Sequence, residues 1–272
     1  MEKETREAVF DGDLGLEAFR LRGMSRPFPM HFHEHYVFGL VEAGKRELRL
    51  GEKRLVVESG CVLTFAPGES HGCVQCGGEL DYRGLNVPVR SVQELMRGKK
   101  LPRTAESVLR SAELCQAFRQ AHEAVICRAP ESERRELMKR LLALLTRERG
   151  AAELPKECRS EVESACEYMR GNYSRRISLD ELCRHAGMSR AALERAFAVE
   201  KGISPHRYLE SVRVSNAKRL LGQGVPPCES ALLTGFSDQS HFTNRFRALT
   251  GLAPGLYSGI FRNEDGDMRN GD

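Results

Sequence analysis

Hydrophobic positions in the first part of the chain follow the short, alternating pattern of β-structure, from about residue 28 to residue 90. Residues 37–41 form an apolar run, and Leu48 and Leu50 then alternate with charged residues. A period of two places successive side chains on opposite faces of a strand. Glycine- and proline-containing turns separate further short runs. This spacing predicts a small sandwich or barrel.

The period changes from strand to helix over residues 105–149. Leu114 and Phe118 are four residues apart, as are Leu141 and Leu145. Side chains at this spacing share one face of a helix. Two amphipathic helices of this kind can pack on the barrel or form a dimer surface, and the sequence leaves both alternatives open.

The rest of the chain divides into a linker, a helical domain and a tail. Residues 1–150 form the first domain, and residues 151–158 are expected to be a linker. Helices and short turns are predicted throughout 159–262. Residues 263–272 are polar and contain glycine, so we expect a disordered tail. The fold class is therefore a β domain with appended helices, followed by an all-α domain.

An internal repeat lies in the helical domain. Four residues recur with a shift of 49 positions: Phe197, Gly202, Pro205 and Tyr208 become Phe246, Gly251, Pro254 and Tyr257. The segment therefore contains one supersecondary unit twice.

Each copy has the signature of helix, tight turn and helix. Gly187 permits the turn in the first copy, and Ser189 is placed to cap the helix that follows. Gly235 takes the same place in the second copy, where Ser237 or Asp238 provides the cap. Ser204 followed by proline starts a long helix between the two units.

Two helix-turn-helix units on one long helix indicate DNA binding. A single unit also occurs as ordinary packing in all-α domains, but its repetition with the same turn glycine and capping residue favours DNA. A recognition helix fits the major groove, and successive grooves on one face lie about 34 Å apart. One chain can therefore occupy two adjacent groove segments.

Charge adds modest support. The net charge is only +4, but residues 159–262 hold 15 Lys and Arg against 10 Asp and Glu. The charged N-terminus lacks a signal-peptide pattern, and no apolar run has the roughly 18 residues that span a bilayer. We therefore expect a cytoplasmic protein without a membrane partner.

Histidines mark a candidate site in the β domain. His31, His33 and His35 alternate along the sequence, so one strand would project all three from the same face. His71 follows a later turn and can meet them. Three imidazoles suit Zn, Fe or Ni, but Val37 or Phe38 stands four or so residues past His33, where a ligating glutamate would be expected. The prediction is therefore no metal and no cofactor, with histidines that line a ligand pocket.

Other chemistry is weakly indicated. Cys73 and Cys76 form a Cys-x-x-Cys pair, which leaves a thiol redox switch open as an alternative. No nucleophilic triad, paired carboxylates or phosphate-binding glycine loop stands out. We therefore do not expect an enzyme.

The helical domain resembles the AraC/XylS family of bacterial regulators, from residue 177 to residue 257. Its most specific part is residues 235–242, Gly-Phe-Ser-Asp-Gln-Ser-His-Phe, followed by Phe246, Gly251 and Tyr257. The β domain is similar to the family's cupin-type sensor domain, through His31, His33, His71 and the neighbouring glycines.

The resemblance implies about seven helices and two recognition helices that read promoter DNA. It places nine DNA-binding positions on these helices: Arg190, Ala191, Glu194, Arg195, Gln239, Ser240, His241, Thr243 and Asn244. Arg195 can pair with guanine, and Gln239 or Asn244 with adenine. Ser240, His241 and Thr243 suit phosphate contacts.

One departure concerns the second unit. Ser230 stands where the family usually has a branched apolar residue. We expect looser packing there, and a Ser230→Ile change that raises thermal stability.

The resulting hypothesis is a transcription regulator, of the activator type common in the family. A small-molecule effector, bound near His31, His33 and His71, would control its binding to double-stranded promoter DNA. RNA polymerase is the expected protein partner, and a homodimer is possible. The alternative is a metal- or redox-sensing cupin, or a cupin enzyme, fused to a DNA-binding module.

Overall fold

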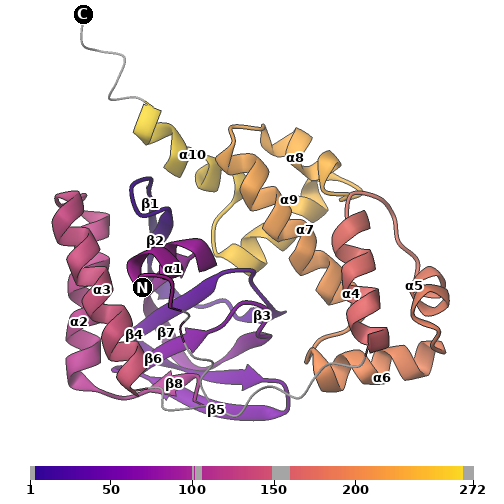
Figure 1. Ribbon diagram of the computed structural model, residues 1–272, viewed down its shortest axis with the longest axis horizontal. Coiled ribbons are helices and arrows are strands. Elements are labelled where there is room, and N and C mark those ends of the chain that lie inside the picture. The colour runs from indigo at the N-terminus through magenta and orange to yellow at the C-terminus, as the bar shows by residue number, and fades with distance from the viewer. Residues whose placement is uncertain (1–3, 100, 102–105, 149–159, 266–272) are drawn as a thin grey trace, which may run out of the picture.

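The computed structural model describes residues 4–99, 101, 106–148 and 160–265, without the side chains of 75–77 and 262–265. A β domain carries helices on one side, and a helical domain lies against its other side (Figure 1). The predicted fold class, a cupin-like domain followed by a helix-turn-helix domain, is confirmed.

The strands of the described chain form one antiparallel sheet in the order β1-β2-β7-β4-β6-β8, with β3 paired to β7 and β5 to β4. Their bounds are β1 Thr5–Asp11, β2 Leu16–Met24, β3 Phe28–His31, β4 Tyr36–Leu50, β5 Lys53–Glu58, β6 Val62–Phe65, β7 His71–Val87 and β8 Val108–Leu109. Strand structure thus begins well before residue 28. The first two strands were missed because charged residues interrupt their apolar pattern.

The two longest strands give the sheet its barrel-like curvature. β4 and β7 pair along most of their length, with register shifts between Val41 and Arg46. On its other edge β4 pairs first with β6 and then with β5. β7 likewise pairs with β3 at its start and with β2 towards its end. Shifts of this kind bend a strand, so both strands take part in two walls.

Side chains of β4 alternate between two cores. Phe38 and Leu40 pack against the appended helices. Val37 and Val41 point into the barrel interior. Both faces are buried, and this explains why residues 37–41 are continuously apolar.

The appended helices cover the outer face of the barrel. They are α1 Val89–Leu95, α2 Ala112–Ile126 and α3 Glu131–Glu148. The prediction of helix over 105–149 was wrong at its start, because β8 precedes α2 and pairs with β6. α1 was also missed, since it spans only seven residues.

Seven helices make up the described part of the C-terminal domain. They are α4 Ser160–Asn172, α5 Leu179–Ala186, α6 Arg190–Glu200, α7 Pro205–Gly222, α8 Pro227–Leu233, α9 Gln239–Thr250 and α10 Pro254–Asp265. Tyr208, Leu209 and Val212 of α7 belong to the core of the first unit. Val214, Ala217 and Leu221 belong to the core of the second. α7 therefore joins two small cores into one rigid domain.

The end of the chain differs from the expectation. α10 continues to Asp265, so residues 263–265 are helical rather than disordered. The rest of the predicted tail and the whole predicted linker, residues 151–158, lie outside the described residues.

Candidate functional site

The first helix-turn-helix unit consists of α5, a tight turn and α6. Gly187 ends α5 in the left-handed conformation, with φ of 65°. Ser189 then caps α6 by accepting a hydrogen bond from the backbone of Ala192 at 3.3 Å. Leu193 and Phe197 are fully buried, which fixes the opposite face of α6 outward. Ala191, Glu194 and Arg195 are exposed on that face, as the sequence predicts.

Arg190 is also exposed but has a partner. Its guanidinium forms two hydrogen bonds of 2.6 Å with the carboxylate of Asp180 in α5. This bidentate pair steers Arg190 towards α5. A contact between Arg190 and DNA would require the side chain to leave Asp180.

The second unit repeats this arrangement with α8 and α9. Gly235 provides the turn, with φ of 78°. Asp238, rather than Ser237, caps α9 by accepting a hydrogen bond from His241 N at 2.7 Å. Of the predicted positions on α9, Gln239, Ser240 and Asn244 are exposed. Thr243 is half-buried.

The His241 side chain lies differently from the expected phosphate contact. Its Nε2 is 3.6 Å from Oε1 of Glu210, and its ring meets Phe236 edge to face. Glu210 is buried in α7 and also pairs with Arg245, at 2.9 Å. His241 therefore links α9 to α7 within the protein.

Ser230 is fully buried in α8. Its hydroxyl donates a hydrogen bond to the carbonyl of Val225 at 3.3 Å. Its own carbonyl accepts one from the Thr234 hydroxyl at 2.6 Å. Polar contacts thus fill the place where an apolar side chain was expected.

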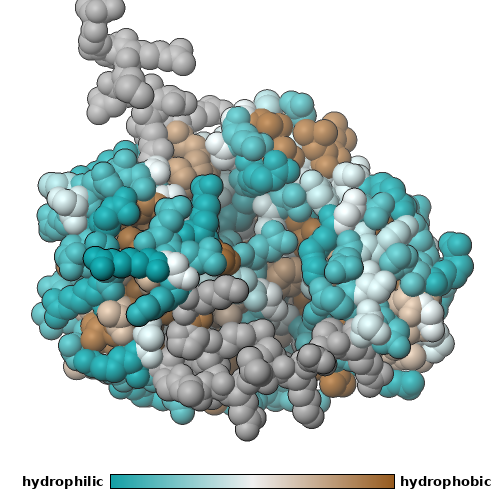
Figure 2. Space-filling view, viewed as in Figure 1, coloured by the Kyte–Doolittle hydropathy of each residue, from teal (hydrophilic) through white to brown (hydrophobic). Residues whose placement is uncertain are grey.

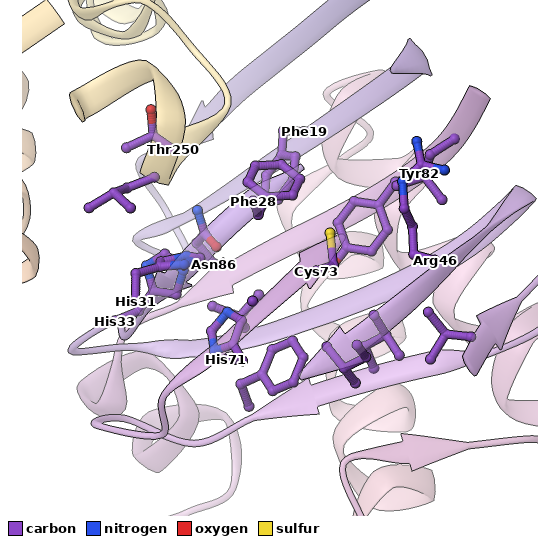
Figure 3. A pocket seen from close by; sticks show the side chains of 18 of the residues that line it. Phe19, Phe28, His31, His33, Arg46, His71, Cys73, Tyr82, Asn86 and Thr250 are labelled. Carbon is purple, nitrogen blue, oxygen red and sulfur yellow. The ribbon is translucent and has the colours of Figure 1, made fainter. Parts of the chain in front are cut away.

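A cavity opens inside the barrel, on the side that faces the helical domain (Figure 3). The space free of protein atoms is about 790 Å³, part of it open to solvent. Most of its walls are apolar side chains of the barrel core, with polar groups from several elements. The lining residues are Phe19, Phe28, His31, His33, Val37, Val41, Arg46, Leu48, Val57, Leu63, Phe65, His71, Gly72, Cys73, Leu80, Tyr82, Asn86, Lys218, Leu249 and Thr250.

Two glycines make room for aromatic rings of this cavity. Gly39 and Gly84 lie opposite each other on β4 and β7. A Cβ at Gly39 would collide with the Tyr82 ring, and one at Gly84 with the Phe19 ring. Neither position can take a side chain unless the ring moves.

The three predicted pocket histidines come together, by a route that differs from the expectation. β3 ends at His31, so His33 and His35 lie in the following turn and not on the same strand. Antiparallel pairing sets His31 opposite His71. The turn then brings His33 back, with Nε2 atoms of His31 and His33 2.9 Å apart.

Burial keeps these imidazoles neutral. It lowers the pKa of His31 to about 4 and the pKa of His35 to about 3. Burial, followed by the other histidines, also holds the pKa values of His33 and His71 well below the ordinary range.

The cavity has one wall from the helical domain. Lys218 of α7 and Leu249 and Thr250 of α9 line it together with the barrel. Lys218 also pairs with Glu17 of β2 at 3.0 Å, and Glu17 accepts a hydrogen bond from the Tyr257 hydroxyl of α10. Burial alone would raise the pKa of Glu17, but the Lys218 ammonium and hydrogen bonds from Tyr257 and Asn86 hold it below its ordinary value.

Comparison with known proteins decides the family. The chain is 36% identical over 250 residues to YbfI, an HTH-type transcriptional regulator of Bacillus subtilis, with 89% of this chain and 90% of that protein covered. The profile of the AraC-like ligand binding domain matches residues 13–145, and that of a helix-turn-helix domain matches residues 182–259. The chain belongs to the AraC family of transcriptional regulators.

Solved structures support the two-domain fold of this AraC-family protein. Apo ToxT from Vibrio cholerae superposes with a TM-score of 0.59 at 12% identity, over 93% of this chain and 99% of that chain. ToxT with bound unsaturated fatty acid gives 0.54 at 12%, over 96% and 98%. This chain is thus an AraC-family regulator with an N-terminal ligand-binding domain and a C-terminal DNA-binding domain.

Sequence reasoning missed the residues that connect the two domains of this regulator. Lys218 carried the one available signal, a charged residue in line with the inward positions Val214 and Leu221 of α7. Glu17 and Thr250 carried none, because their contacts depend on how the domains pack.

The redox alternative gains little from the AraC-family structure. Cys73 is half-buried and lines the cavity. The side chain of Cys76 lies outside the described residues, so the pairing of Cys73 with Cys76 stays a hypothesis.

Among the described helices, none is long and apolar enough to cross a membrane.

Proposed function

We propose that α6 and α9 enter successive major grooves of promoter DNA and read bases in both. The predicted side chains that are exposed on these helices support this, as do the side-chain caps at the starts of both helices. Arg195 would pair with guanine, and Gln239 and Asn244 with adenine. Glu194 suits a cytosine amino group, and Ala191 a thymine methyl.

Other predicted positions would hold the phosphate backbone. Ser240 and Thr243 have hydroxyls suited to phosphate contacts, which position the protein without specifying sequence. Arg190 can join them once it releases Asp180. The contact between His241 and Glu210 makes His241 a support for α9 rather than a DNA ligand.

The regulator is proposed to respond to a small molecule with an apolar body and a polar end. The cavity offers such surroundings, with valine, leucine and phenylalanine walls, and Lys218 also lines it. The histidines and Asn86 lie toward one end, and Arg46 lies toward the other (Figure 3). The fatty acid bound to ToxT is a ligand of this chemistry. His31, His33 and His71 would contact the polar end.

One observation carries the regulatory proposal: the cavity wall includes Lys218 of α7 and Thr250 at the end of α9. α9 is the second recognition helix. A ligand in the barrel therefore touches the DNA-binding domain directly and can change its orientation. Binding and DNA affinity must then be linked reciprocally.

Differential scanning fluorimetry against unsaturated fatty acids and other amphipathic compounds, followed by DNA titration, tests this proposal. A ligand should raise Tm and change the Kd for DNA, and Lys218→Met should weaken that response. Lys139→Met, a half-buried lysine of α3 outside the cavity lining, is the matched control and should leave it intact. If no compound shifts either quantity, effector control is contradicted.

Partner proteins are proposed on the exposed surface. Leu232, Leu233 and Leu256 have exposed fractions of 71%, 47% and 65%, and brown side chains gather over α8 in Figure 2. Exposed apolar patches mark interaction sites. RNA polymerase, for transcription activation, and a second copy of the chain are the proposed partners.

The proposed location is the cytoplasm, where promoter DNA is available, and no catalytic role is proposed.

A further inference from the structure

The three cavity histidines form a compact nitrogen cluster. One ring nitrogen each from His31, His33 and His71 lies within 4.8 Å of the other two. His31 and His71 are cross-strand partners, so the sheet register fixes their separation. The His33 carbonyl accepts a hydrogen bond from Gly68 N at 2.8 Å, which anchors the third member. Figure 3 shows these side chains at one end of the cavity.

Backbone carbonyls select the tautomer of two of these rings. His31 Nδ1 is 2.7 Å from the carbonyl of Pro29, and His71 Nδ1 is 3.0 Å from the carbonyl of Glu69. A carbonyl only accepts, so each Nδ1 carries the hydrogen and each Nε2 keeps a lone pair. Metal-ligating histidines are held in this way by a backbone carbonyl or carboxylate.

The plane of one ring is also fixed. His71 stacks on Phe65, with ring centroids 3.8 Å apart and an interplanar angle of 6°. His33 Nε2 lies 2.9 Å from His31 Nε2. A direct imidazole–imidazole hydrogen bond accounts for this approach, and a tetrahedral metal ion that replaced it would hold the two nitrogens about 3.3 Å apart. The metal-free hydrogen bond is therefore the competing explanation.

We propose that His31, His33 and His71 bind one divalent transition-metal ion of the Zn²⁺ class, with an open coordination position directed into the cavity. Three imidazoles suit such ions. Three protein ligands with one free position let a further molecule bind the metal. The open position would take an oxygen, nitrogen or sulfur donor of the effector, a part of the inference that rests on the proposed function.

Metal titration of the full-length protein, after removal of metal with EDTA, tests this site. Calorimetry with Zn²⁺ and visible absorption with Co²⁺ should show one equivalent per chain, a tetrahedral Co²⁺ spectrum and a rise in Tm. His33→Ala and His71→Gln should each weaken binding by about 100-fold or more, beyond the 10–100-fold typical of outer-shell changes. His122→Gln is the matched control, a buried histidine of α2 outside the cluster.

Two results would overturn the metal site. The first is the absence of stoichiometric binding to wild-type protein. The second is unchanged affinity in His33→Ala, a half-buried turn position whose folding is checked by circular dichroism. Effector response in EDTA-treated protein separates the two proposals. If ligands still change DNA affinity while no metal binds, the metal site fails and effector control stands. If metal binds but no ligand changes DNA affinity, the metal site stands and effector control fails.

Discussion

The ammonium group of Lys218 in α7 lies 3.0 Å from the carboxylate of Glu17 in β2, and 201 residues separate the two along the chain. Both side chains are largely buried, with exposed fractions of 10% and 16%. The pair joins the helix shared by both helix-turn-helix units to the wall of the cavity. A ligand that competes for Lys218 would therefore act on domain docking.

Removing one member of this pair should destabilise the protein, because the other would remain buried without its nearest opposite charge. We expect Lys218→Met to lower the free energy of unfolding by about 3 kcal/mol. Lys139→Met, a half-buried lysine of α3 whose ion pair with Glu136 is largely solvated, should change it by less than about 0.5 kcal/mol.

A double-mutant cycle in urea checks the pairing. Lys218→Met combined with Glu17→Gln should cost less than the sum of the two single changes. Strict additivity would show that the two groups are not coupled.

Arg195 is the sharpest test of base reading. Arg195→Ala should weaken specific DNA binding by about 1–3 kcal/mol and relax the preference at one base position. Arg135→Ala, a half-buried arginine of α3, is the control and should leave affinity unchanged. Fluorescence anisotropy with a set of single-base variants measures both effects. An equal loss on every sequence would make Arg195 a phosphate contact.

His122 should make stability depend on pH. Burial lowers its pKa to about 4, from 6.5. Above pH 6.5 His122 is neutral in both states, but between pH 6.5 and about pH 4 only the unfolded chain binds the proton. The free energy of unfolding therefore falls as pH falls through this range, by about 1.4 kcal/mol for each pH unit.

His122→Gln removes this titration. The stability difference between wild type and variant should shrink by roughly 2 kcal/mol between about pH 7.5 and pH 5, measured by denaturant unfolding. His206→Gln, an exposed histidine of α7, gives the reference. A difference that stays constant with pH would contradict the assignment.

Ser230→Ile should lower thermal stability, the opposite of the sequence-based expectation. Ser230 is fully buried and donates to the Val225 carbonyl. A larger side chain in a filled site costs about 1–3 kcal/mol, and Val225 would lose a donor. Differential scanning calorimetry decides between the two expectations. Ser230→Ala, which adds no volume, should lower the stability less. A raised Tm for Ser230→Ile would instead confirm the sequence-based expectation.

The helical domain was largely predictable because its information is local. The turn glycines and the capping residues Ser189 and Asp238 determine the structure within a few positions of themselves. The 49-residue repeat is visible directly in the sequence. The cavity was harder to predict, since bent β4 and β7 and their register shifts create it. His31 and His71 were grouped correctly, but the turn that returns His33 was not foreseen. Lys218 and Glu17 meet only after the domains pack.

Selection of bound sequences from random double-stranded DNA, at about 0.15 M salt, tests the central claim most directly. Two short motifs with centres about one helical turn apart should be enriched, because α6 and α9 would read adjacent major-groove segments. A single motif would contradict base reading by the second unit. Binding without any enrichment, which disappears as salt rises, would contradict sequence-specific recognition altogether.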